Sequence, residues 1–325
     1  MADDFLPTAT IEMLRQRAEV VRSIRSFFDQ RNFFEVETPT ISHDIVVDRY
    51  LHPIGVTKSD LTGRAGDSDQ RLWLQTSPEF GMKRLVAAGA VAIYQICKAY
   101  RRDEIGRIHN PEFTMLEWYR AGDDLVTGMD LLAELVETIL DTPKTERLSY
   151  REAFKKFADI DPFESSIESL QNTVRTASVT VELEGESRDD YLNVILSEIV
   201  EPNLGVGAPT IIYDWPASQA ALAMVRDDEH SVAERFEIYV NGVELANGYH
   251  ELLEARELSR RNSINNQMRV KDGNQLLPEG SRLLDAMRKG IPQCAGVALG
   301  VDRLVMLALG AKSVSEVMAF TIDNA

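Results

Sequence analysis

The sequence contains little cysteine and no long hydrophobic run. Only two cysteines occur in 325 residues, Cys97 and Cys294, and they lie far apart in apolar, strand-like segments. This spacing gives neither a metal-ligand pattern nor a disulfide framework. No run of about 18 apolar residues is present, so no membrane span is expected. The acidic N-terminus has no apolar signal-peptide core behind it, and we therefore expect a cytoplasmic protein without a membrane partner.

Positive charge is also scarce. The chain has 35 lysine and arginine residues against 52 aspartate and glutamate residues, which gives a formal net charge of −17. Proteins whose main partner is a nucleic acid usually present net positive surface, because neutralising phosphates supplies much of the affinity. The negative net charge argues against tRNA or DNA as the main partner. It is equally well explained if the protein is an ordinary acidic enzyme.

Hydrophobic spacing and breaker residues predict an α+β fold. Residues 10–31 show helical spacing behind Thr10, a good N-cap. Ser77 is expected to cap a second helix with Pro78 in its first position, and Asn241-Gly242 predicts a type I′ hairpin. Extended segments are expected at 33–38, 72–76, 93–103, 113–120, 211–214, 235–240, 243–249 and 293–299. Further helices are expected at 125–141, from Ser149 onward and at 302–309.

These elements predict a single domain over residues 1–325. Neighbouring strands are expected to pair in antiparallel fashion with helices outside them, which gives an antiparallel β-sheet flanked by helices. Residues of about 123–210 read as a helix-rich insertion with weak patterning. Within it, Glu182–Asp190 is expected to be mobile.

The first group of chemistry-bearing residues lies on the hairpin expected around His109. Strand alternation places on one face of its first strand Gln95, Cys97, Ala99, Arg101 and Asp103. One face of its second strand carries Phe113, Met115, Glu117 and Tyr119. Small residues, an arginine, an aromatic ring and carboxylates suit a bound nucleotide, although a solvated hairpin face is the plainer reading.

The second group is the run from Gly296 to Arg303. Gly296, Ala298 and Gly300 leave room on one strand face for a flat ligand. Asp302 is expected to cap the following helix, and Arg303 opens it. A helix N-terminus with an arginine can bind a phosphate, but a glycine-bearing turn from strand to helix is common without one.

The third group is a pair of carboxylates, Glu244 and Glu251, on either side of Asn247-Gly248-Tyr249. Carboxylates near a phosphate site can hold Mg²⁺, which prefers oxygen ligands and shares them with substrate phosphates. They can also pair with an ammonium group. A surface carboxylate pair is the alternative.

Together these segments resemble the three signature motifs of class II aminoacyl-tRNA synthetases. The first helix, the following strand and Pro39 resemble motif 1, which lies at the homodimer interface in that family, so the resemblance implies a homodimer. Residues 100–113 resemble motif 2, and residues 300–303 resemble motif 3. The stretches 109–117 and 244–252 are similar to the lysine-specific subclass.

Within this subclass residues 215–222 and 296–300 make the chain similar to the stand-alone paralogues that attach (R)-β-lysine to translation elongation factor P, the elongation factor P–(R)-β-lysine ligases. Lysyl-tRNA synthetases carry an anticodon-binding OB domain before the core. Here the motif 1-like segment lies within the first 40 residues, and we expect no such domain. Ala298 stands where the synthetases usually have glycine. Its methyl group is expected to fill part of the amino-acid pocket and to favour the 3-amino isomer of lysine.

The resemblance implies an ATP-dependent ligase that works in two steps with ATP and Mg²⁺. The β-lysine carboxylate attacks the α-phosphorus of ATP and gives an adenylate and pyrophosphate. The ε-amino group of a lysine on elongation factor P then attacks the adenylate, and AMP leaves. The resemblance implies no tRNA partner.

The resemblance also implies roles for individual residues. Arg101 and Arg303 would be catalytic, Arg101 by holding the α-phosphate and the carboxylate. Glu244 and Glu251 would hold Mg²⁺. The residues expected to bind ATP are Arg101, Arg102, Asp103, Asn110, Phe113, Glu244, Leu245, Gly300 and Arg303. The residues expected to line the amino-acid pocket are Ser77, Pro78, Glu79, Tyr119, Glu251 and Ala298.

Two positions depart from the family pattern, and three other functions stay open. Asp103 is one methylene shorter than the usual glutamate, and Arg102 replaces an asparagine. The first alternative is a truncated lysine–tRNA ligase that activates α-lysine. The others are an ammonia-dependent asparagine synthetase and a paralogue that has lost catalysis and serves as a regulator or binding module.

Overall fold

The computed structural model describes residues 5–67, 70–177 and 187–325, which form two compact units. The first unit comprises Met1–Gly122, Leu253–Gln293 and Ala298–Ala325. The second comprises Asp123–Leu252 and Cys294–Val297, so it begins where the helix-rich segment is predicted to begin. Along the described ranges, no helix has the length and apolar character that crossing a membrane requires.

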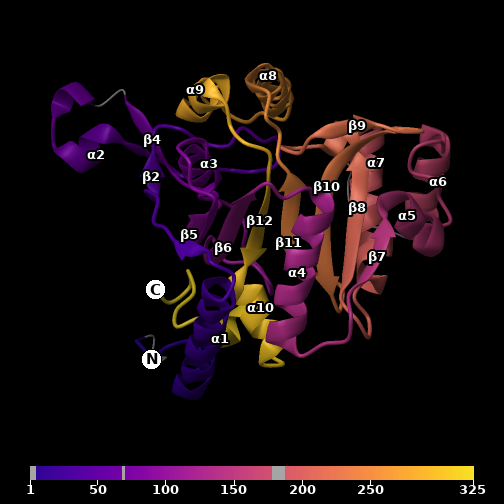
Figure 1. Ribbon diagram of the computed structural model, residues 1–325, viewed down its shortest axis with the longest axis horizontal. Coiled ribbons are helices and arrows are strands. Elements are labelled where there is room, and N and C mark those ends of the chain that lie inside the picture. Colours follow the sequence, from indigo (N-terminus) through magenta and orange to yellow (C-terminus); the bar gives the residue numbers. More distant parts are fainter. Residues whose placement is uncertain (1–4, 68–69, 178–186) are drawn as a thin grey trace. The chain divides into compact units, whose positions relative to one another are not determined.

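The first unit contains three strands of the larger sheet, a separate three-stranded sheet and several helices (Figure 1). Strand β1 (Phe34–Glu35) pairs with β5 (Ala92–Tyr100), which pairs with β6 (Glu112–Ala121). The second sheet is formed by β2 (Ile41–Ser42), β4 (Arg71–Leu74) and β3 (Gly55–Thr57). The helices are α1 (Ile11–Asp29), α2 (Lys58–Thr62), α3 (Glu79–Ala87), α8 (Ala255–Lys271), α9 (Arg282–Lys289) and α10 (Val301–Ala308), with short 3₁₀ turns at Ala65–Asp67 and Val314–Val317.

Helix α1 forms where the sequence predicts it and covers one face of the β5–β6 hairpin. The Thr10 side chain accepts a hydrogen bond from the Met13 backbone N–H, which confirms the predicted cap. Phe28 stacks on Tyr94 of β5 with ring centroids 4.7 Å apart and lies 5.3 Å from Trp118 of β6. Alternating residues of both strands therefore point to the opposite face, which carries the predicted site residues.

The second unit is a four-stranded core with helices on both faces. Its strands are β7 (Glu146–Ser149), β8 (Thr210–Pro216), β10 (Ser231–Val240) and β11 (Val243–His250), with β9 (Val225–Asp227) paired to β10. Its helices are α4 (Leu125–Leu140), α5 (Tyr150–Ala158), α6 (Ile167–Thr176) and α7 (Arg188–Ile195), with short turns at Leu196–Val200, Glu201–Asn203 and Ala217–Gln219. Strand β12 (Cys294–Gly300) contributes its first residues to this unit and its last to the other.

Small residues and turn-forming residues explain how α4 packs in the second unit, where its hairpin turns and where α5 begins. Gly128 lets α4 approach the strands, because an added Cβ would lie 2.9 Å from the Ala295 side chain and 3.2 Å from Phe236. Asn241 and Gly242 both have positive φ, at 51° and 71°, which confirms the predicted β10–β11 hairpin. Ser149 caps α5 in a capping box, as predicted.

Two expectations about the fold need correction. The strands are not all antiparallel, because β1 pairs with β5 and β7 pairs with β8 in parallel; the α+β class is confirmed. Of the stretch Glu182–Asp190, residues 182–186 lie outside the described residues. Residues 187–190 are not a mobile loop but form the cap and first turn of α7, where Ser187 and Asp190 make a capping box.

Candidate functional site

The β5–β6 hairpin places the predicted residues on one face of the strands, but β5 ends at Tyr100. Its register pairs Gln95 with Glu117 and Ala99 with Phe113, so these four residues share one face as expected. The prediction that strand β5 continues to Asp103 is wrong. Asp103 has a φ of 71°, in the left-handed region, and this ends the alternation on which the prediction rested.

Arg101 follows the last residue of β5 and lies against Phe113. Its backbone N–H donates to the Pro111 carbonyl, and its guanidinium carbon is 5.1 Å from the Phe113 ring centroid. Its Nε donates to the Thr76 carbonyl at 3.4 Å, and Nη1 lies 3.5 Å from Glu104 Oε1. The structure therefore brings together the predicted phosphate-binding arginine and the predicted adenine-binding ring.

Arg102 and Asp103 point into solvent rather than along the Arg101 face. Arg102 Nε lies 3.0 Å from Asp103 Oδ2, and both side chains are more than half exposed. The Arg102 backbone N–H donates to the His52 carbonyl. An exposed ion pair of this kind contributes little to stability, so both side chains can turn toward a bound nucleotide at small cost.

Arg303, in the first turn of α10, contacts the tip of the hairpin. Its Nη2 donates to His109 Nε2 at 2.6 Å, and its Nε donates to the Ile108 carbonyl at 3.3 Å. Gly300 is the N-cap of this helix, and a Cβ there would meet only the Arg303 side chain, at an ordinary 3.7 Å. His109 was not predicted as a site residue, although it lies within residues 100–113, the segment that resembles motif 2.

Asp302 does not cap α10, contrary to the prediction. The N-cap is Gly300, so Asp302 already lies inside the first turn. Its carboxylate is buried, accepts a hydrogen bond from the Thr114 backbone N–H at 2.7 Å and pairs with Arg17 of α1 at 2.6 Å. Asp302 therefore joins α1, β6 and α10 and holds Arg303 next to the hairpin.

Replacing Asp302 with alanine is expected to lower the free energy of unfolding by about 3 kcal/mol, because it leaves the partly buried Arg17 guanidinium without its carboxylate and the Thr114 N–H without its acceptor. Urea denaturation measures the change. As a matched control, Arg25→Ala breaks the half-exposed pair with Glu35 and is expected to cost no more than about 1 kcal/mol. Equal effects of the two substitutions would contradict the role of Asp302.

Asn110 is buried and holds the hairpin tip to the C-terminal segment. Its Nδ2 donates to the Glu112 carbonyl at 2.6 Å, and its Oδ1 accepts from the Ile322 N–H at 3.0 Å. Both ends of the amide have backbone partners here. Its predicted contact with the adenine edge stays a prediction.

The predicted amino-acid residues of the first unit meet where α3 packs on β6. Ser77 is not the cap of α3. The N-cap is Pro78, whose carbonyl accepts from the Gly81 and Met82 N–H groups, so the helix begins one residue later than predicted. Glu79, its first residue, is buried together with Lys83, with Nζ and Oε1 2.5 Å apart.

Glu117 and Tyr119 of β6 are also buried in this region. Lys83 and Glu117 were not among the residues predicted to bind the amino acid. Tyr119 donates to Glu117 Oε1 at 2.6 Å, and Lys83 Nζ lies 6.0 Å from the Tyr119 ring centroid. Burial, and then the charge of Glu117, raise the pKa of the Cys97 thiol to about 12. We call Glu79, Lys83, Glu117 and Tyr119 the α3–β6 wall.

The second unit carries Glu244, Leu245 and Glu251 on or beside β11. A register shift gives Glu244 the opposite residue Tyr239 and leaves Leu245 without one, so Leu245 is a bulge. The bulge puts Glu244 on the same face as Asn247. Glu251 follows the end of the strand, is buried, and donates its backbone N–H to the Cys294 carbonyl.

Glu237 is a buried carboxylate on the strand next to Glu244, and it was not among the predicted site residues. It lies opposite Asn247 and contacts Arg235 Nη2 and the Tyr239 hydroxyl, each at 2.5 Å. Burial raises the pKa of Glu237, Arg235 opposes that shift, and the charge of Glu244 adds to it. Glu251 lies just beyond the last residue of β11, seven positions after Glu244, and the Mg²⁺ ion predicted to bind both stays a prediction.

The sequence matches the family described as tRNA synthetases class II (D, K and N) over residues 4–324. The chain belongs to this family. Membership agrees with the α+β fold and with an ATP-dependent ligase that activates an amino acid. Members of class II use ATP with Mg²⁺, and Arg101, Phe113 and Arg303 stand in this chain's motif 2-like and motif 3-like segments.

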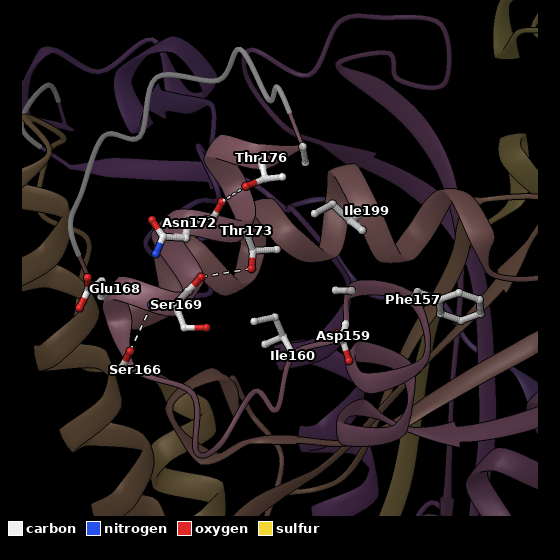
Figure 2. A pocket seen from close by; sticks show the side chains of 12 residues that line it. Phe157, Asp159, Ile160, Ser166, Glu168, Ser169, Asn172, Thr173, Thr176 and Ile199 are labelled. Atoms are coloured by element: carbon white, nitrogen blue, oxygen red, sulfur yellow. Dashed lines mark hydrogen bonds between the residues drawn. The ribbon is translucent and has the colours of Figure 1, made fainter.

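Two other features of this class II family member do not add to the site. An open pocket of about 630 Å³ in the second unit is lined by residues of α5, α6 and the turn after α7 (Figure 2). Its hydroxyl groups mostly serve α6 itself, as when Thr173 and Thr176 donate to carbonyls one turn back. Glu164, Glu229 and His230 also lie close together, but Arg151 pairs with both carboxylates.

Proposed function

We propose that this protein activates (R)-β-lysine with ATP and transfers it to the ε-amino group of a lysine on translation elongation factor P, as a homodimer. Family membership supports the activation step. The choice of amino acid and of acceptor rests on the resemblance of residues 215–222 and 296–300 to the ligases of that factor. α-Lysine is the second candidate substrate, because the lysine-type stretches 109–117 and 244–252 do not distinguish the isomers.

The contact of Arg101 with Phe113 is the observation that carries the activation step. A guanidinium beside an aromatic ring, with a strand face of small residues next to it, suits a nucleotide whose base lies on the ring and whose α-phosphate meets the guanidinium. Arg303 would contact the triphosphate or the base. We propose that the nucleotide also contacts Arg102, Asp103, Asn110 and Gly300.

The reaction balances without a covalent enzyme intermediate. A carboxylate oxygen of the amino acid bonds to the α-phosphorus as the bond to pyrophosphate breaks. The acceptor amine then bonds to the activated carbonyl carbon, AMP leaves with the former carboxylate oxygen, and the amine loses a proton. Catalysis consists of positioning and of stabilising the charge that develops on the α-phosphate.

We propose that Mg²⁺ binds Glu244 and Glu251, with Glu237 as a further candidate ligand because it shares a sheet face with Glu244. Carboxylates offer the oxygen ligands that Mg²⁺ prefers, and Leu245 follows Glu244 in the chain. When bound, the ion would neutralise phosphate oxygens of ATP. We propose that Glu251 also pairs with an ammonium group of the amino acid.

The α3–β6 wall is proposed to hold the amino acid, with Ser77 and Pro78 at its edge. A substrate with two ammonium groups needs buried carboxylates opposite them.

The test of the whole proposal is to incubate the protein with ATP, (R)-β-lysine and purified elongation factor P, and to record the intact mass of the factor. We expect a gain of one lysyl group. No gain with β-lysine, together with aminoacylation of tRNA by α-lysine, would favour the alternative.

Replacing Ala298 with glycine is expected to raise kcat/KM for α-lysine relative to (R)-β-lysine by about tenfold or more, because one methyl group in a pocket discriminates on that scale. Amino-acid-dependent ATP–pyrophosphate exchange measures both substrates. Ala295→Gly, on the same strand, is the control and should leave the ratio unchanged. An unchanged ratio in Ala298→Gly would remove Ala298 from the amino-acid pocket.

A further inference from the structure

Helix α8 carries a buried arginine that binds the main chain of a distant segment. Arg269 is 1% exposed. Its Nη1 donates to the carbonyls of Asp48 and Leu51, at 2.7 and 2.8 Å, and its Nε donates to the Gln275 carbonyl at 3.1 Å. Arginine is rarely buried this deeply, because its guanidinium loses contact with water. Here main-chain carbonyls take the place of that water, so the side chain attaches residues 48–51 to α8.

The same segment has two further contacts with α8 and its C-terminal end. The Arg49 backbone N–H donates to Asn265 Oδ1 at 3.1 Å. The Arg49 guanidinium pairs with the two carboxylate oxygens of Asp272, the C-cap of α8, at 2.6 and 3.0 Å. Helix α8 therefore holds residues 48–51 through both main-chain and side-chain contacts, and Arg269 makes its part of them from inside the protein.

The residue that follows this segment is hydrogen-bonded to the chain beside Arg101. The His52 carbonyl accepts the Arg102 N–H at 2.8 Å. The Pro111 carbonyl accepts the Arg101 N–H at 2.9 Å. Strand β5 has ended before these two residues, so the position of the Arg101 backbone depends on these two bonds. One of them comes from the chain that Arg269 holds.

We propose that Arg269 is a positioning residue for Arg101. It fixes residues 48–51, the adjoining His52 carbonyl fixes Arg102, and the Arg101 guanidinium is thereby presented to the α-phosphate. A displacement of about 1 Å at a reacting centre can cost about a hundredfold in rate, so loosening this segment should slow adenylate formation. This inference rests on the proposed function, because it takes Arg101 to bind the α-phosphate of ATP.

The test is a double-mutant cycle between Arg269 and Arg101, followed by ATP–pyrophosphate exchange. Arg269→Met removes the donors and keeps a long side chain. It is expected to lower kcat about 30-fold and to leave both KM values within about threefold. In an Arg101→Ala background the same substitution should lower kcat less than about threefold further, because a residue that acts through Arg101 has nothing left to position. Rates are compared per folded molecule, with the folded fraction taken from urea denaturation.

The matched control is Arg188→Met in the second unit. Arg188 also donates three hydrogen bonds to main-chain carbonyls, two to Pro162 at 3.2 and 2.7 Å and one to Ser165 at 2.7 Å. Its replacement should lower the free energy of unfolding but change kcat per folded molecule less than about twofold, with or without Arg101. A purely structural role of Arg269 would give the same result as this control.

Two outcomes would overturn the proposal. One is a kcat of Arg269→Met that matches the Arg188→Met control. The other is a full 30-fold further loss when Arg269→Met is added to Arg101→Ala, because the two residues would then act independently. If Arg269→Met does not fold, Arg269→Lys, which keeps the charge without the planar fork, takes its place in the cycle with an expected loss of about fivefold. A wild-type protein that exchanges with no lysine isomer would instead refute the proposed function.

Discussion

Replacing Arg101 with alanine is expected to reduce ATP–pyrophosphate exchange roughly a thousandfold, the scale on which a single charge-stabilising group at a reacting centre acts. Its guanidinium lies against Phe113 and next to the Thr76 carbonyl, whereas that of the neighbouring Arg102 pairs with Asp103 in solvent. The loss should fall mainly on kcat, because the charge on the α-phosphate grows as the adenylate forms. Steady-state exchange over a range of ATP and amino-acid concentrations gives both constants.

Two further variants test whether geometry or charge alone matters at this position. Arg101→Lys keeps the charge but loses the planar fork, and should recover only part of the activity. Arg64→Ala, an exposed arginine of the same unit, is the matched control and should change exchange less than about twofold. If Arg101→Ala retained a tenth of the wild-type kcat, the proposed role of Arg101 would be wrong.

Replacing Arg303 with alanine is expected to lower kcat/KM for ATP roughly a hundredfold. The substitution removes a guanidinium proposed to grip ATP and also the contacts of α10 with His109 and Ile108. Both effects act on the nucleotide, so the KM for ATP should rise more than the KM for the amino acid. The same exchange assay measures this, with ATP varied at saturating amino acid.

Two substitutions separate the two effects of losing Arg303. His109→Ala removes the contact of Arg303 with the His109 ring and keeps the Arg303 guanidinium, so it should cost clearly less than Arg303→Ala. Arg107→Ala breaks another tether of this loop, the hydrogen bond to the Lys312 carbonyl, and should leave the KM for ATP within about twofold. If Arg107→Ala matched Arg303→Ala, loop anchoring would explain the loss and no direct contact of Arg303 with ATP would be needed.

Local rules predicted the elements that depend on local chemistry. Thr10, Ser149 and the Asn241-Gly242 turn were correctly identified, because a cap or a tight turn is decided by a few neighbouring residues. The faces of β5 and β6 followed from simple alternation as far as Tyr100. The parallel pairings of β1 and β7 could not be predicted, since they join segments far apart in the chain.

Alternation and capping rules failed where a long-range partner decides the conformation. Asp103 leaves the strand in a left-handed conformation that no periodicity reveals. Asp302 was predicted as a cap because an acidic residue after a glycine turn usually serves as one. Its actual partners, Arg17 and Thr114, lie 285 and 188 positions away in the sequence by their numbers.

The residues missed at the site had weak but readable signals. Lys83 stands four residues after Glu79, the spacing at which helical side chains meet. Glu117 was placed on the correct face but given no role, and Glu237 stood outside the carboxylate pair chosen for Mg²⁺.

Amino-acid-dependent ATP–pyrophosphate exchange tests the central claim most directly, because it reports adenylate formation before any acceptor is involved. With ATP, Mg²⁺ and labelled pyrophosphate, we expect exchange that requires an amino acid and is faster with (R)-β-lysine than with α-lysine. Aspartate and asparagine, the other amino acids of the family, should give none. Exchange that is absent with every lysine isomer, or that is fastest with aspartate, would contradict the account.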